Sequence, residues 1–176
     1  MLTATPTMDP PIHIVPYDPR WPGIFEQERL LLHDLLSPWL AGAIEHVGST
    51  AVVGLAAKPI IDIMAGVESL SASADAQHAL AQHGYHYAPY KSDVMHWFCK
   101  PSPEVRTHHL HLVPYQSALW SERLAFRDLL RSDPTLALEY DALKRDLAAR
   151  HRDDREAYTD AKWPFIERVL TASIRA

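Results

Sequence analysis

Residues 45–63 read EHVGSTAVVGLAAKPIIDI, and this stretch decides the fold. It begins as a strand, passes through a turn of small residues that carries a hydroxyl, and ends in a second apolar strand. That second strand holds one carboxylate, Asp62, among isoleucines. A carboxylate is unfavourable among apolar side chains unless something compensates its charge, so we expect Asp62 to face a cleft, a cation or a charged partner.

The segments before and after this stretch predict an α+β fold, with a mixed sheet of about four to five strands and flanking helices. Apolar residues at helical spacing begin at about Pro22 and end at Ser37-Pro38. An amphipathic helix with a serine-rich start is expected after the second strand, with Gly84 as its C-terminal cap. Strands are expected over 43–47 and 59–67, and the helix over 69–83. Extended segments are then expected over 85–90, 95–100 and 106–114.

The last two of these extended segments are expected to pair as an antiparallel hairpin. From residue 117 onward the pattern is helical, in three pieces. They are expected over 117–131, 136–151 and 155–173.

Composition narrows the class of protein. The chain has 176 residues, a net charge of −5 and one cysteine, Cys99. One domain over 12–176 is the natural expectation, and the acidic balance argues against a protein that coats extended nucleic acid or an anionic membrane. Residues 1–11 carry prolines and neither a basic nor an apolar run, so we expect a disordered segment and no signal peptide. We expect a cytoplasmic protein.

Strand parity gives the strongest argument about the site. Side chains two apart in a strand share a face, so Asp62 is opposite in direction to the apolar Ile61 and Ile63. In the segment 107–113, His109 and His111 share one face, while His108 is on the other with the leucines. If the two strands are neighbours, Asp62, His109 and His111 converge. Such a set could hold a divalent cation or transfer protons; its other interpretation is a partly exposed polar pair.

The turn between the strands offers a second group of candidates. Gly48, Ser49 and Thr50 supply backbone N–H groups and hydroxyls suited to a phosphate, or else form an ordinary tight turn. Lys58 precedes a proline, is expected to be extended, and could reach the same cleft. By parity with Gly48, His46 rather than Glu45 is expected to point into the cleft. Glu45 could still be a second carboxylate or an ion-pair partner.

Helical spacing adds further pairs. Tyr158 and Lys162 are four residues apart, as are Tyr140 and Lys144, so each pair occupies one helix face. An aromatic ring beside a cation could stack a base and hold a phosphate, or it could be a lysine stem packed on a surface tyrosine. The pair Arg123 and Arg127 is expected to be solvated.

Residues 44–52 (IEHVGSTAV) and 58–63 (KPIIDI) resemble the GrpB family of small bacterial proteins. The match extends to 15–22 (VPYDPRWP), 107–113 (THHLHLV) and 158–162 (YTDAK), and so spans nearly the whole chain. The order Gly48-Ser49 followed by an aspartate in an apolar strand also resembles the active-site signature of the nucleotidyltransferase superfold. The resemblance implies a nucleotidyltransferase-like core, involves His109 and His111 in the site, and favours Tyr158 and Lys162 over the other tyrosine–lysine pair.

The chain departs from an active transferase of that superfold, which uses a second carboxylate two positions after the first. Here that position is Met64, and histidines stand where a third carboxylate is expected. The set Asp62, His109 and His111 suits zinc, manganese or nickel better than magnesium.

Three functions follow from these features. The first is atypical nucleotidyl or phosphoryl transfer, with Asp62, His109 and His111 as catalytic and metal-binding residues. The second is a nucleotide- or coenzyme-binding module without turnover, of the kind associated with dephospho-coenzyme A kinase. The third is a metal-dependent phosphoester hydrolase. In each, the partner is a phosphorylated small molecule.

Overall fold

A five-stranded mixed sheet, in the order β1-β2-β5-β4-β3, forms the centre of the computed structural model, which describes residues 11–174. β2 and β5 pair in parallel, and every other neighbouring pair is antiparallel. The α+β fold and the hairpin of β4 and β5 are therefore as predicted. The strands are β1 (Leu40–Val47), β2 (Ile61–Val67), β3 (His86–Tyr87), β4 (His96–Pro101) and β5 (Arg106–Pro114).

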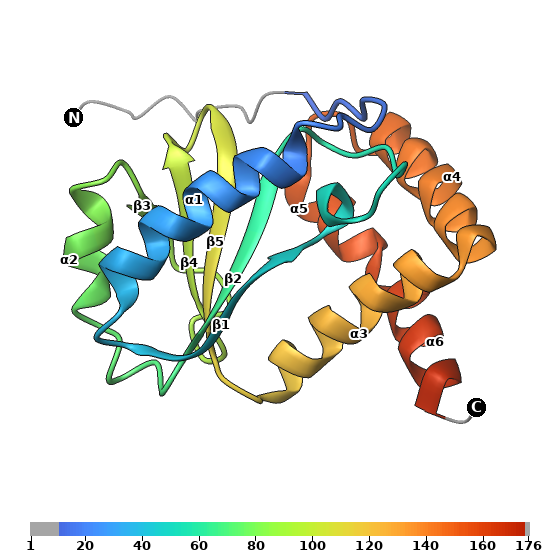
Figure 1. The fold of residues 1–176 in the computed structure, drawn as a ribbon. Coiled ribbons are helices and arrows are strands. Elements are labelled where there is room, and N and C mark those ends of the chain that lie inside the picture. The colour runs from blue at the N-terminus through green and yellow to red at the C-terminus, as the bar shows by residue number, and fades with distance from the viewer. Residues whose placement is uncertain (1–10, 175–176) are drawn as a thin grey trace.

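Helices flank the sheet on both sides. Figure 1 shows α1 lying across the sheet, and α3 to α6 gathered beside it. Across residues 11–174, every helix is too short or too polar to cross a membrane. The helices are α1 (Trp21–Leu36), α2 (Ala76–Ala81), α3 (Ala118–Ser132), α4 (Pro134–Arg150), α5 (Arg155–Ala161) and α6 (Trp163–Ile174), with the short 3-10 helix η1 (Ser49–Ala51).

The largest apolar cluster lies between the sheet and α1 with α2. Ile63, Leu110 and Leu112 from the strands are fully buried there, against Leu32 and Leu36 of α1. These strand residues are the ones that alternation assigns to the core. α1 thus covers one face of the sheet, and Asp62, His109 and His111 lie on the other.

A smaller apolar cluster lies on that other face. It contains Val47, Met64, Met95, Val113 and Trp120, the last from the start of α3. Met64 is fully buried in this cluster, so its side chain serves packing.

Two predicted elements are shorter than expected. The helix expected over 69–83 is reduced to α2, because serine side chains in its first half bond to nearby backbone instead. Ser73 Oγ donates to Ser69 O at 2.8 Å, and Ser69 Oγ accepts from the amide of Ala72 at 3.0 Å. The strand expected over 85–90 is reduced to the two residues of β3.

The predicted helix over 155–173 is wrong in a different way, since it is two helices. α5 ends at Ala161, α6 starts at Trp163, and Pro164 stands in the first turn of α6, where its missing N–H is tolerated. β1 is longer than expected, starting at Leu40, with a register irregularity between Leu40 and Ile44. The expectation for residues 1–11 lies, apart from Pro11, outside the described residues.

Candidate functional site

Asp62 meets two histidines because β2 and β5 run parallel and in register. Asp62 is paired with His109, and Met64 with His111. His109 Nδ1 lies 3.0 Å from Asp62 Oδ1, and because an ionised carboxylate only accepts, the ring nitrogen carries the proton. His111 Nε2 lies 3.8 Å from the same oxygen. The predicted convergence of these three side chains is confirmed.

Burial sets the charge states of this group. Burial alone would raise the pKa of Asp62, but its interactions with His109 and then His111 hold that pKa well below its usual range. Burial lowers the pKa of His109, and burial with the nearby charge of Arg123 lowers the pKa of His111 to about 3. An ionised carboxylate that orients a neutral imidazole is one half of a proton-transfer arrangement.

The three side chains do not direct their lone pairs at one shared point in this arrangement. A shared ion needs lone pairs directed at one point, whereas His109 Nδ1 directs its proton at Asp62. Within residues 11–174 no three His, Cys, Asp or Glu side chains are placed to hold an ion. His109 Nε2 and His111 Nε2 are buried and find no hydrogen-bond partner in this part of the chain. Metal binding here stays a prediction.

Gly48 brings the turn against Asp62. Its φ of 71° lies in the left-handed region, and a Cβ there would stand 2.5 Å from Asp62 Oδ2. Both the backbone conformation and the close approach require glycine. Gly48 is exposed and Ser49 is half-buried, so the start of the turn borders the carboxylate and the solvent.

Thr50 and His46 support the turn from inside. Thr50 Oγ1 is 2.9 Å from His46 Nε2 and donates to Ile60 O at 3.3 Å, and both side chains are buried. The His46 ring stacks on Phe25 of α1 at 4.6 Å, and burial lowers its pKa to about 4. The prediction that His46 rather than Glu45 points into the cleft is wrong.

The reason lies in the end of β1. The left-handed φ of Gly48 stops the alternation at that residue, so parity counted from Gly48 does not carry back into the strand. His46 is paired with Ile63, a residue of the α1 face, and Glu45 with Met64 on the other face. Glu45 there forms an ion pair with Arg127 at 2.7 Å, which was its alternative role.

Lys58, Tyr158 and Lys162 come together beside the histidines. The Nζ atoms of Lys58 and Lys162 lie 5.0 Å and 4.5 Å from the centroid of the buried Tyr158 ring. Burial and then the charge of Lys58 lower the pKa of Lys162 to about 7, while Asp62 acts in the opposite direction. The charge of Lys58 also lowers the pKa of His109. These three residues, predicted from separate motifs, are thus part of one cluster.

Sequence reasoning noted the residue pairs of α3 and α4 but did not predict that they are buried. Arg127 is only 10% exposed, so the expectation of a solvated arginine pair is wrong, and Arg123 carries a charge that acts on Asp62. Tyr140 is buried and its side chain interacts with that of Ser49. Lys144 is buried too, and its ammonium donates to Ala56 O, which ties α4 to the loop before β2. The spacing of these residues was visible, but not the side of the helix that faces inward.

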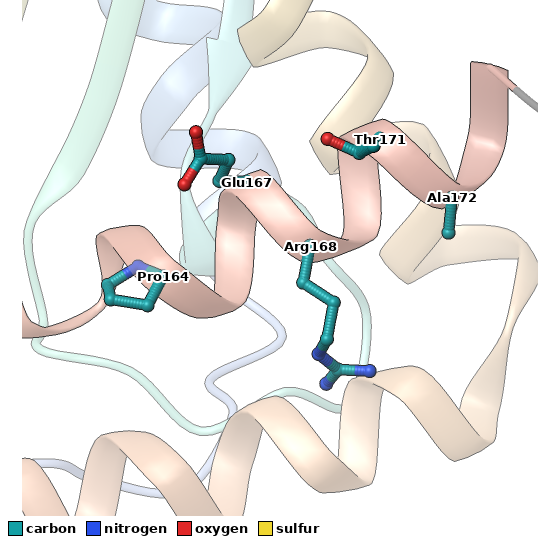
Figure 2. A pocket seen from close by; sticks show the side chains of 5 residues that line it. All are labelled: Pro164, Glu167, Arg168, Thr171 and Ala172. Atoms are coloured by element: carbon teal, nitrogen blue, oxygen red, sulfur yellow. The ribbon is translucent and has the colours of Figure 1, made fainter.

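A pocket of about 470 Å³ lies elsewhere, on α6 (Figure 2). Arg168 at its edge stacks on Phe165 at 4.8 Å and contacts Glu139 at 3.4 Å. None of its lining residues belongs to the cluster around Asp62, and no candidate chemistry gathers there. The residues that line this pocket are Pro164, Glu167, Arg168, Thr171 and Ala172.

Fold and site together define an α+β protein with a carboxylate–histidine pair and a group of cations on one face of its sheet. The GrpB protein family model matches residues 11–172, and the chain belongs to this family. It is 35% identical to the glutamate-rich protein GrpB of Alkalihalophilus pseudofirmus, over 89% of this chain and 92% of that protein.

The chain is also similar to a protein of known structure and to part of a longer protein. The crystal structure of the conserved protein GrpB from Enterococcus faecalis has a TM-score of 0.82 and 33% identity, covering 93% of this chain and 98% of that one. A dephospho-CoA kinase of Mycolicibacterium paratuberculosis is 30% identical over 88% of this chain but only 44% of its own length. The present fold therefore corresponds to part of that longer protein.

Proposed function

We propose that this protein binds a phosphorylated small molecule, such as a nucleotide, at the cluster of Asp62, Lys58 and Lys162. The observation that carries the proposal is the gathering of cations around one carboxylate. Lys58 and Lys162 share the Tyr158 ring, and Arg123 adds a third positive charge near Asp62. Together these cations place positive charge beside Asp62, which favours an anionic ligand.

The chemistry next to this anion site supports transfer as the activity to test. The imidazole of His109, oriented by Asp62, lies within reach of the charge of Lys58. Because Nδ1 directs its proton at Asp62, the buried Nε2 is the atom that would accept a proton from an attacking hydroxyl when a ligand reaches it. The lysines would stabilise negative charge on a phosphoryl group. A divalent ion, if one joins the site, would neutralise phosphate charge.

Calorimetry with ATP, GTP, CTP, UTP and coenzyme A tests the proposal. Each ligand is measured with magnesium, manganese, zinc or a chelator. Lys162→Met is expected to weaken binding by about tenfold to a hundredfold, the worth of a charge-assisted hydrogen bond. Arg150→Gln is the matched control, since Arg150 pairs only with Asp146 on the exposed side of α4 in the described chain. If the unmodified protein binds none of these ligands, the proposal is overturned.

Asp62→Asn separates two forms of the proposal. If the ligand binds directly to the cations, removing the carboxylate raises affinity in chelator, because a repulsive charge is gone. If binding passes through a metal ion held by Asp62, the same change abolishes it. The sign of the change in affinity thus decides the role of metal.

A second candidate is a coenzyme-binding module without turnover. It is favoured by the similarity to part of a dephospho-CoA kinase and by Met64, which fills the second carboxylate position. It predicts coenzyme A binding in chelator and no product when each nucleotide is incubated with the protein. Release of pyrophosphate or phosphate above the level of the Asp62→Asn variant would exclude it.

A further inference from the structure

Arginines lie at positions 123, 127 and 131 of α3, on one face of the helix. Two of them, Arg127 and Arg131, form hydrogen bonds to oxygen atoms of other elements. Arg127 Nη1 donates to Glu45 Oε2 at 2.7 Å and to His46 O at 3.1 Å. Arg131 donates twice to Ala51 O, at 3.0 and 2.9 Å. These bonds attach α3 to the end of β1 and to η1, so they hold the turn in front of Asp62.

Arg123 is different from its two neighbours. Among residues 11–174, its hydrogen bond runs from Nη2 to the sulphur of Met95 at 3.8 Å, and a thioether is a weak acceptor. A guanidinium has five N–H donors, and this one is partly buried. A cation in such a position is unfavourable unless an anion completes its hydrogen bonds.

The surroundings of Arg123 show where such an anion would bind. His111 Nδ1 approaches the same Met95 sulphur at 3.4 Å, and His111 in turn lies 3.8 Å from Asp62. Arg123 therefore borders the Asp62 site and not an unrelated surface. Asp62 is shared with His109 and His111, so it does not serve as a dedicated partner of the guanidinium.

We propose that Arg123 binds the anionic group of the ligand together with Lys58 and Lys162, while Arg127 and Arg131 position the turn. This rests on the proposed function, because it adds a binding residue to the same site. A guanidinium offers two parallel donors to two oxygens of a phosphoryl group, whereas each lysine acts as a point charge. Arg123 thus supplies the directional part of anion recognition.

Stability distinguishes a ligand-binding role from a structural one. Arg123→Met removes an under-satisfied charge and places an apolar chain against Met95, so the unfolding temperature is expected to stay equal or rise. Arg131→Met leaves the carbonyl of Ala51 without its two donors and is expected to lower that temperature. The two variants remove the same charge from the same face of α3, at residues 123 and 131.

The experiment is calorimetry with ATP and coenzyme A, alongside thermal unfolding, for the unmodified protein, Arg123→Met, Arg123→Lys, Arg131→Met and Arg150→Gln. We expect at least a tenfold loss of affinity for Arg123→Met, a smaller loss for Arg123→Lys, and none for Arg150→Gln. Unchanged binding by Arg123→Met, or a fall in its unfolding temperature as large as that of Arg131→Met, overturns the role of Arg123 alone. If the unmodified protein binds neither ligand, the proposed function fails and this inference fails with it.

Discussion

The two faces of the central sheet are made from alternate residues of the same strands, yet they do different work. On the α1 face, Ile63 and Leu110 are fully buried in a continuous apolar cluster. On the other face, Asp62, His109 and His111 gather with cations from the helices. One face supplies stability through burial, and the other keeps charges together at a cost in stability.

Polar residues occur on the α1 face as well, and the contrast is instructive. Glu28 Oε1 accepts from Tyr85 Oη at 2.8 Å and from Lys100 Nζ at 2.7 Å, so one carboxylate is matched by two donors. His108, whose side chain shares this face with the leucines, lies near Glu28 and Lys100. A buried polar group does not by itself mark a site. What marks the other face is the gathering of Lys58, Lys162 and Arg123 near Asp62.

The largest effect is expected from the α1 face. Leu110→Ala should lower the free energy of unfolding by about 2–5 kcal/mol, because it removes a fully buried side chain and leaves a cavity. Urea unfolding followed by circular dichroism measures this. Ligand affinity of the folded variant should stay unchanged, since the residue faces away from Asp62. A loss of affinity at temperatures where the variant is folded would show that the two faces are not independent.

Gly48→Ala tests the contact between the turn and Asp62. A left-handed φ costs an alanine about 1–2 kcal/mol, and here the added Cβ also meets the Asp62 carboxylate. Gly54→Ala is the control, because Gly54 has a φ of 82° with nothing near its Cβ position. We expect both to be destabilised, Gly48→Ala more, and only Gly48→Ala to lose ligand binding. Equal effects of the two changes would mean that the turn does not support the site.

Lys162 should make stability depend on pH. Its pKa is about 7 in the folded chain, below the usual value near 10.5, so between these values the unfolded chain binds more protons than the folded one. Stability therefore rises with pH above about 7, by at most about 1.4 kcal/mol per unit. Lys144, with a pKa of about 8, acts in the same direction.

The measurement is urea unfolding at several values between pH 7 and 9.5, below the range in which tyrosines ionise. Lys162→Met should reduce the rise and leave the part due to Lys144. Saturating phosphate ligand should also flatten it, because an anion favours the charged lysine. If the slope of stability against pH is identical in the unmodified protein and in Lys162→Met, Lys162 is solvated and does not belong to the cation cluster.

The smallest effect is expected from Thr50→Val. It removes the hydroxyl that bonds with His46 and Ile60, at about 0.5–1.5 kcal/mol, and leaves the shape nearly the same. Thermal unfolding measures the loss, and affinity should be nearly unchanged because this side chain is buried inside the turn. A large loss of affinity with normal stability would assign Thr50 to the ligand instead.

The sequence predicted the sheet and the meeting of Asp62 with His109 and His111, because alternation in strands is a local rule. It failed for His46, since a left-handed glycine ends that rule, and for residues 69–75, where serine hydroxyls compete for the backbone. It also failed for Arg127. Whether a helix face meets solvent or the sheet depends on tertiary packing, which residue spacing alone does not contain.

The parallel pairing of β2 with β5 places Asp62 beside His109 although 47 residues separate them along the chain. The segment between Glu68 and Val94 leaves the sheet and returns to it, and it contributes only α2 and the two-residue edge strand β3. The register of β2 against β5 therefore sets the distance between carboxylate and imidazole. A change in the length of the intervening segment that keeps this register would leave the contact between Asp62 and His109 in place.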